Sequence, residues 1–358
     1  MDADSIPSKH QGIVYDKPGE LSTKLIEIDT PEPGSGQILV KITHTGVCHS
    51  DLSIMLNGWV GLAPLTTNTQ VGGHEGIGNI VKFGPGCESA GLKLGDRVGI
   101  KWVAEACLSC PRCLTGTETL CTKQKNSGYS CPGTFQEYVL SSAYYVTRIP
   151  DGLDSAMAAP LLCGGVTVYS ALKKCRAQPG DWVAMSGAGG GLGHLGLQIG
   201  KAMGFRMLGL DIPEKEEFIF ECGAEKFVDV KGNVPKDVLS ATDNEAVAAV
   251  VICNSSNDAY ATGLNLLKFN GTLVCVGVPN GIPVPIASTY PAAIIFKQLH
   301  IVGSAVGSRQ DANEVLALAN RGLVKTHFSL HSKEDLGKLF EEMEAGRVKG
   351  RYVLDMSC

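Results

Sequence analysis

One stretch decides the fold: Trp182-Val183-Ala184-Met185-Ser186-Gly187-Ala188-Gly189-Gly190-Gly191-Leu192-Gly193. A short apolar strand runs into a glycine-rich turn, and a helical pattern follows over residues 194–203. Glycines let the backbone turn sharply and approach a pyrophosphate, whose negative charge meets free N–H groups at the start of the helix. The stretch therefore predicts a dinucleotide-binding turn with contacts at Gly187, Gly189, Gly190, Gly191, Leu192 and Gly193.

The next predicted strand ends in a carboxylate. Asp211 stands eighteen positions beyond Gly193, where it can accept hydrogen bonds from both hydroxyls of an adenosine ribose. The same charge repels a 2′-phosphate, so the sequence favours NAD over NADP, with Lys215 as a neighbour of the ribose. A glycine-rich run alone also fits a tight turn beside a sheet, but strand, helix and Asp211 in register favour the nucleotide site.

From this stretch onward, apolar segments alternate with helical patterns. They lie at 182–186, 206–211, 226–230, 249–253, 272–278 and 299–303. Strands joined by helical crossovers predict a doubly wound parallel sheet. The chain before Pro150 instead carries short β segments between glycine and proline turns, which predicts a mainly antiparallel β domain. We expect a first domain over 1–163, completed by 306–358, and a nucleotide-binding domain over 164–305.

Composition excludes several classes of protein. The 358 residues are 44% hydrophobic and 19% charged, and a net charge of -5 gives no basic excess for binding nucleic acid. Residues 2–11 are polar and no later run is apolar enough to span a bilayer, so we expect no membrane segment and a cytoplasmic location. The 13 cysteines are odd in number, which favours thiols and metal sites over a disulfide framework.

Four of these cysteines form a compact group. Cys107, Cys110, Cys113 and Cys121 follow the spacing C-x2-C-x2-C-x7-C. Four thiolates can close a tetrahedral shell around one zinc ion with no position left open. The spacing therefore predicts a structural zinc site.

A second set of metal-binding side chains is scattered along the chain. Cys48 lies in Gly46-Val47-Cys48-His49-Ser50-Asp51, His74 and Glu75 lie in Gly72-Gly73-His74-Glu75-Gly76, and Cys163 precedes two glycines. Spacing alone does not assemble these residues into a site. A lone cysteine beside glycine is more often a small buried residue.

Read together, these motifs resemble the zinc-dependent alcohol dehydrogenases of the medium-chain dehydrogenase/reductase family, and most closely their yeast and fungal type. The likeness runs from the segment around Cys48 to the last predicted strand, 351–355. It implies a GroES-like, mainly antiparallel β catalytic domain followed by a Rossmann coenzyme domain, an α/β fold overall.

The resemblance also implies roles at the metal. Cys48, His74 and Cys163 would bind a catalytic zinc with a fourth position open for water or substrate, and Glu75 would be an alternate ligand. Asp51 would orient His74, and Ser50 would take the proton of the alcohol. The histidine that ends this relay in the yeast type is replaced here by Ser53.

Further residues are assigned by the same resemblance. His49 and Arg351 would face the cofactor pyrophosphate, Thr167 would lie beside the nicotinamide, and Val278 stands where the yeast type has a bulkier methionine. Trp59 and Trp102 would narrow the pocket toward small primary alcohols. The polar stretch 60–70 suggests a substrate with polar groups, unless it is only a surface loop.

The sequence thus predicts an alcohol:NAD oxidoreductase with two zinc ions per chain, acting on a small alcohol or aldehyde. One alternative is a reductase of a larger or polar aldehyde in a specialised pathway. Another is a non-catalytic zinc- and NAD-binding redox sensor, which the complete ligand set and Ser50 disfavour. Segment 299–303 resembles the edge that joins subunits in the family, so we expect a homo-oligomer, with dimer and tetramer both open.

Overall fold

The computed structural model describes residues 6–357, which form two compact units. The first unit takes in the described residues up to Cys163, Ser308–Ala317 and the described residues from Phe328 onward. The second comprises Gly164–Gly307 and Leu318–His327. The division expected from the sequence kept all of 306–358 in the first domain, whereas residues 318–327 pack with the second unit.

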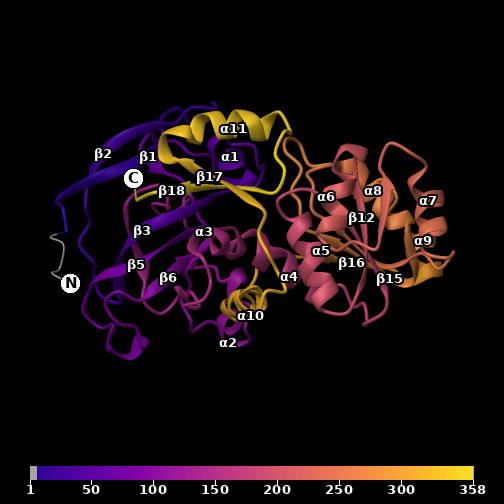
Figure 1. The fold of residues 1–358 in the computed structure, drawn as a ribbon, viewed down its shortest axis with the longest axis horizontal. Helices are drawn as coiled ribbons and strands as arrows, with labels where there is room; N and C mark the ends of the chain where they lie inside the picture. The colour runs from indigo at the N-terminus through magenta and orange to yellow at the C-terminus, as the bar shows by residue number, and fades with distance from the viewer. Residues whose placement is uncertain (1–5, 358) are drawn as a thin grey trace. The chain divides into compact units, whose positions relative to one another are not determined.

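The second unit is built on a parallel sheet of six strands (Figure 1). Its strands are β11 (Trp182–Ser186), β12 (Arg206–Asp211), β13 (Lys226–Asp229), β14 (Val247–Ile252), β15 (Leu267–Cys275) and β16 (His300–Gly303). The order β13-β12-β11-β14-β15-β16 starts at the centre and winds outward in both directions. The predicted doubly wound sheet is confirmed.

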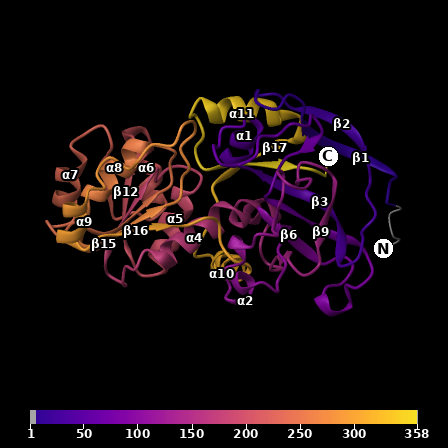
Figure 2. The same ribbon diagram turned by 180° about the vertical axis from the view of Figure 1, so that it is seen from behind.

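Helices flank this sheet, as Figures 1 and 2 show. They are α4 (Gly164–Lys174), α5 (Gly193–Ala202), α6 (Glu216–Glu221), α7 (Val234–Ala241), α8 (Asn257–Asn265) and α9 (Pro291–Lys297). Helix α8 begins where Ser256 accepts the N–H of Ala259, and α7 begins with Asn233 as cap and Pro235 in its first turn. Because helices cover both faces of the sheet, every residue of the central strand β14 is buried.

Among the strands of this sheet, β15 differs most from the sequence-based prediction. Strand β15 begins at Leu267 and ends at Cys275, instead of running over 272–278. Beyond Cys275 the chain leaves the sheet, because the N–H of Gly277 turns back to the carbonyl of Ile252 on the neighbouring strand.

The first unit is mainly antiparallel β, as predicted. Its strands are β1 (Lys9–Tyr15), β2 (Lys24–Asp29), β3 (Gln37–Val47), β4 (Gln70–Val71), β5 (Gly76–Phe83), β6 (Arg97–Ile100), β7 (Val103–Glu105), β8 (Lys125–Asn126), β9 (Tyr138–Ser142), β10 (Thr147–Arg148), β17 (Phe328–Ser332) and β18 (Arg351–Asp355). The largest sheet has the order β10-β6-β5-β3-β18-β17, and β9 also pairs with β3. The C-terminal strand β18 therefore lies directly beside β3, which ends just before Cys48 (Figure 1).

Short helices complete this unit. They are α1 (His49–Met55), α2 (Pro111–Leu114), α3 (Ser155–Ala158) and α11 (Leu336–Glu344), together with α10 (Arg309–Asn320), whose last residues belong to the second unit. Among the largest fully buried side chains of its core are the rings of Tyr15, Phe135, Tyr145 and Phe340.

Among the described residues, no single helix has the length and apolar character needed to cross a membrane. The bent pair Ser155–Leu162 and Gly164–Lys174 meets that test by length and composition. Most of its residues are buried in the protein, as in core helices that meet the same test.

Candidate catalytic metal centre and cofactor loop

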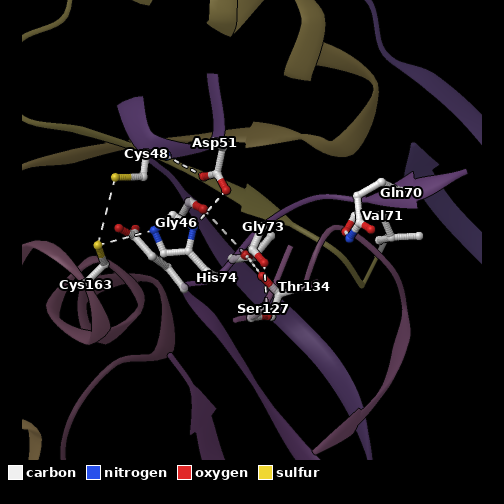
Figure 3. Close-up of polar contacts among 12 residues, drawn as sticks. Gly46, Cys48, Asp51, Gln70, Val71, Gly73, His74, Ser127, Thr134 and Cys163 are labelled. Carbon is white, nitrogen blue, oxygen red and sulfur yellow. Dashed lines mark hydrogen bonds and ion pairs between the residues drawn. The ribbon is translucent and has the colours of Figure 1, made fainter. Parts of the chain in front are cut away.

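Three separate elements bring the scattered metal-binding side chains together. Cys48 follows β3, His74 lies between β4 and β5, and Cys163 follows the 3-10 helix Ala159–Leu162. The Sγ atoms of Cys48 and Cys163 are 4.0 Å apart, and Nε2 of His74 is 3.3 Å from Sγ of Cys163 (Figure 3). With a carboxylate oxygen of Glu75, the ligand atoms all lie within 4.8 Å of one another.

Asp51 binds two of the predicted metal ligands, Cys48 through its backbone and His74 through its ring. Cys48 has an extended backbone and caps α1, where its own N–H donates to Oδ2 of Asp51 at 3.0 Å. The other carboxylate oxygen, Oδ1, lies 2.8 Å from Nδ1 of His74. Since Asp51 binds Nδ1, Nε2 is the ring nitrogen of His74 that faces the cysteine sulfurs.

Hydrogen bonds from the backbone hold the histidine loop. The carbonyl of Gly73 accepts the hydroxyl of Ser127 and the N–H of Thr134, both at 3.1 Å (Figure 3). Ser127 also donates its N–H to the carbonyl of Trp102. The loop that carries His74 is therefore tied to the bend between β6 and β7 that carries Trp102.

The buried ionisable side chains of this site shift one another's pKa values. The contact with Cys163 and the nearby Arg351 guanidinium lower the pKa of Cys48 well below its usual range. The same contact, with burial, raises the pKa of Cys163. Burial opposes a charged His74, but Asp51 outweighs it and raises the pKa of that ring. Burial raises the pKa of Glu75 to about 7.

This donor set fits a zinc ion. Two sulfurs and one imidazole nitrogen, held within reach of one centre, are the ligands that catalytic zinc takes when one position stays open. Glu75 Oε2 is buried and has no hydrogen-bond partner in the described chain, as expected for a carboxylate able to reach the metal. The residues predicted for the catalytic zinc are thus brought together in one place.

A side chain at position 46 would displace the carboxylate of Glu75. A Cβ atom there would lie 1.9 Å from Oε2 of Glu75. The glycine before Cys48 therefore makes room for the carboxylate behind the ligands.

The four-cysteine group also converges. Sγ of Cys107 lies 3.9 Å from that of Cys113 and 3.6 Å from that of Cys121, and the Cys110 and Cys113 sulfurs are 3.6 Å apart. N–H groups of Ser109 and Cys110 lower the pKa of Cys107 to about 6. Four thiols in one cluster fit a closed tetrahedral zinc site.

In the second unit, Asp211 anchors the glycine loop. The strand β12 ends with Asp211, whose Oδ2 accepts the N–H of Gly189 at 2.9 Å, while Nζ of Lys215 lies 3.8 Å from Oδ1. A Cβ at Gly193 would lie 2.2 Å from the carbonyl oxygen of Gly187. The loop therefore needs glycine for its close packing, as the motif predicted.

Comparisons with known proteins agree with these sites. Residues 34–151 match the family model "Alcohol dehydrogenase GroES-like domain", and residues 191–321 match "Zinc-binding dehydrogenase". Alcohol dehydrogenase 2 of Emericella nidulans is 52% identical, and the alignment covers 100% of both chains. The chain belongs to the zinc-dependent alcohol dehydrogenases of the medium-chain dehydrogenase/reductase family.

Solved structures show the same architecture. Acetophenone reductase from Geotrichum candidum in complex with NAD has a TM-score of 0.86 and 27% identity, covering 98% of each chain. Alcohol dehydrogenase from Aeropyrum pernix has a TM-score of 0.85 and 28% identity, covering 97% of this chain and 99% of its own. Zinc-dependent alcohol oxidoreduction is therefore the family's chemistry and that of this chain, and the two alternative functions are not favoured.

Aromatic rings pack beside His74, one of the predicted metal ligands of this family member. Trp102 meets His74 edge to face with ring centroids 5.4 Å apart, and meets Trp59 at 6.4 Å. Tyr129 stacks on Trp102 at 6.2 Å and donates its hydroxyl to the carbonyl of Ala63. The two predicted wall residues lie together, and Tyr129 joins them.

The polar stretch after Trp59 is a surface loop. Thr66, Thr67, Asn68 and Thr69 are all exposed. Loop residues on the surface can also carry function, so the suggestion that these residues select a polar substrate stays a prediction.

The remaining predicted residues lie on separate elements. Ser50 is half-buried on α1, and His49 is exposed at the start of that helix, with Nδ1 3.4 Å from the hydroxyl of Ser53. Thr167 is buried on α4, and Val278 is 49% exposed beyond β15. The assignment of these residues to cofactor and substrate remains a prediction.

Arg351 lies beside the metal-binding residues of the first unit. It is buried, donates to the carboxylate of Glu75, and places Nη1 3.9 Å from Sγ of Cys48. Nothing in the sequence near Glu75 indicates this partner, because the two residues are 276 positions apart. The contact of Arg351 with the cofactor pyrophosphate stays a prediction.

Proposed function

We propose that the chain interconverts small primary alcohols and aldehydes by hydride transfer to and from NAD. The observation that carries the proposal is the convergence of Cys48, His74 and Cys163, with Asp51 fixing the tautomer of the histidine. Zinc bound there supplies a Lewis acid that lowers the pKa of an alcohol hydroxyl and polarises a carbonyl. The protein supplies the orientation of the substrate and the path of its proton.

Residues of α1 handle the proton. Ser50 takes the proton from the alcohol, since a hydroxyl donates and accepts at once. The hydroxyl of Ser53 lies in contact range of the exposed imidazole of His49 on the same helix face. Proton release therefore ends at solvent through this helix turn instead of through a histidine at position 53.

NAD rather than NADP is the proposed cofactor. Asp211 is 8% exposed at the end of β12 and carries a negative charge where the ribose of a bound dinucleotide is recognised. The carboxylate of Asp211 would repel the 2′-phosphate of NADP. Nζ of Lys215 lies 3.8 Å from Oδ1 of Asp211, which places its ammonium group beside a ribose held by that carboxylate.

Small substrates are proposed because aromatic rings close the site. The rings of Trp59, Trp102 and Tyr129 pack on one another beside His74. Rigid rings exclude branched chains sterically.

The protein is also proposed to form homo-oligomers through β16. This strand is an edge of its sheet, and neighbouring apolar side chains are widely exposed, among them Phe269 at 73%, Ile282 at 87% and Phe296 at 77%. An unpaired edge beside exposed apolar groups is suited to pairing with a second copy. The cytoplasmic location stays a prediction from composition.

The test is a panel assay on the purified full chain with its metal content measured. We expect about two zinc ions per chain and reduction of NAD with ethanol, with far lower rates on NADP and on branched alcohols. Cys163→Ala should keep about one zinc and lose turnover. Turnover that survives this change, or a wild-type chain holding no more than one zinc, would sink the proposal.

A further inference from the structure

The second residue of helix α5 in the second unit is a fully buried histidine. His194 is 0% exposed and lies directly after the glycine loop. Its Nδ1 lies 2.9 Å from the carbonyl oxygen of Gly190, and its Nε2 lies 3.3 Å from the backbone nitrogen of His327. Neither the metal chemistry nor the proton path uses this residue.

The two contacts define one tautomer. A carbonyl oxygen can only accept, so Nδ1 of His194 carries the proton. The backbone N–H of His327 can only donate, so Nε2 keeps its lone pair. His194 is therefore a neutral imidazole with both nitrogens engaged, and it joins the glycine loop to the segment that ends at His327.

Two hydrogen bonds from His194 hold the carbonyl oxygen of Gly190 away from the unbonded N–H groups of the glycine loop. This oxygen accepts Nδ1–H of His194 and also the N–H of that same residue at 3.1 Å, which occupies both lone pairs. The N–H of Gly190 in turn donates to the carbonyl of Gly187. Within residues 6–357, the next three N–H groups, of Gly191, Leu192 and Gly193, donate to no other group.

This arrangement matters for an anion. Free N–H groups at the start of a helix attract a pyrophosphate, whereas a carbonyl oxygen turned among them would repel it. His194 is the only side chain among the described residues recorded as binding the Gly190 carbonyl.

A second side chain on α5 strengthens the attachment. One turn after His194, Gln198 donates Nε2–H to the carbonyl of Lys325 at 2.9 Å and accepts the N–H of Lys325 at 2.8 Å. Gln198 and His194 thus bind Lys325 and His327 on one helix face. The segment Leu318–His327 is held against the helix that carries the loop.

We infer that His194 is a positioning residue for the cofactor: it locks the Gly190 carbonyl inward and so presents the amides of residues 191–193 to the pyrophosphate. The inference rests on the proposed NAD function, because the phosphate site it serves is that of the dinucleotide. It adds a residue that contacts no part of the cofactor itself.

Isosteric variants separate the two bonds. An asparagine amide places its nitrogen near the position of Nδ1, so His194→Asn keeps a donor for Gly190 and loses the bond from His327. His194→Gln places its oxygen near Nε2, keeping the acceptor and losing the loop bond. His194→Leu loses both, and His331→Leu, in the first unit, is the matched control.

The readout is the dissociation constant of ADP-ribose, which carries the pyrophosphate without the nicotinamide, measured by calorimetry alongside NADH. We expect His194→Leu and His194→Gln to bind both about tenfold more weakly, corresponding to about 1.4 kcal/mol. His194→Asn and the control should stay within about threefold of wild type. Thermal unfolding of each variant checks that it is folded.

The outcomes distinguish the inference from the function on which it rests. A folded His194→Leu that binds ADP-ribose as wild type does would overturn the inference alone. Equal losses in the Asn and Gln variants would also overturn it, because the loop bond would then have no special role. If the wild-type chain bound neither ADP-ribose nor NADH, the proposed cofactor itself would be refuted.

Discussion

The guanidinium of Arg351 donates to the carboxylate of Glu75 in a buried ion pair beside the metal ligands. The two side chains are 4% and 0% exposed, so water can satisfy neither charge. Arg351→Met would leave the carboxylate of Glu75 without its cation. We expect the free energy of unfolding to fall by about 3–5 kcal/mol.

This prediction is checked by denaturant unfolding of the wild type, Arg351→Met, Glu75→Gln and the double variant. The double variant Arg351→Met, Glu75→Gln removes both charges and should recover most of the lost stability, because no unpaired charge stays buried. Zinc content is measured on each preparation, so that metal loss is not mistaken for loss of the pair. A double variant as unstable as Arg351→Met would contradict the electrostatic explanation.

Lys101 gives a prediction about pH. Its ammonium group is buried, bonds the carbonyl of Tyr145 and the hydroxyl of Thr147, and burial lowers its pKa to about 7. Between about pH 7 and the unfolded pKa near 10.5 the unfolded chain binds more protons, so the stability cost of this group shrinks as pH rises. We expect wild type to gain stability over this range relative to Lys101→Met.

The comparison uses unfolding at about pH 7 and about pH 9.5. Between these two pH values the free energy of unfolding of the wild type should rise by about 3 kcal/mol more than that of Lys101→Met. This figure follows from the difference between the folded and unfolded pKa of Lys101 over the range. Lys93→Met, at an exposed position, is the control and should show the wild-type gain. If Lys101→Met gained as much stability as the wild type, Lys101 would not carry the effect.

The local parts of the structure could be read from the sequence. Strand, glycine turn and helix are adjacent in the chain, so the motif around Gly187 predicted both the parallel sheet and the loop. The four cysteines lie within fifteen residues, and their spacing alone indicated one metal cluster. Both predictions depend on short-range geometry that the residue types themselves restrict.

Long-range pairs could not be read in this way. Cys48 and Cys163 are 115 positions apart, and only resemblance to a family joined them. Glu118, in the four-cysteine segment, accepts the N–H of Arg309 from 191 positions away, and no pattern near either residue indicates the contact. Such pairs depend on how strands are ordered in the sheet, which hydrophobic spacing does not specify.

The four-cysteine cluster should be separable from catalysis. Cys113→Ser removes one of four ligands, and we expect metal content to fall from about two zinc ions per chain to about one. The segment 107–121 should then exchange its amide hydrogens faster, and the unfolding temperature should fall by roughly 5 °C or more. Cys131→Ser, outside the cluster, is the matched control and should keep both zinc ions.

Position 53 tests the proton path. Ser53 is 2% exposed and its hydroxyl contacts His49. This hydroxyl can relay a proton, but unlike an imidazole it does not take up an additional proton near neutral pH. Ser53→His should introduce a group titrating near pH 6.5 and steepen the dependence of kcat on pH between about pH 5.5 and about pH 8. Ser53→Ala is the control for loss of the hydroxyl, and identical profiles for wild type and Ser53→His would remove position 53 from the path.

The aromatic wall gives a prediction about substrate size. Trp102 lies edge to face on His74 and on Trp59, so its ring occupies space directly beside the metal ligands. Trp102→Ala removes that ring, and we expect kcat/KM for a branched secondary alcohol to rise relative to ethanol by about tenfold or more. Tyr129→Phe keeps the stacked ring while removing only its hydroxyl, so the ratio should stay near the wild-type value. Because Trp102 also supports His74, zinc content accompanies each assay; an unchanged ratio in a variant that holds both zinc ions would show that this ring does not set substrate size.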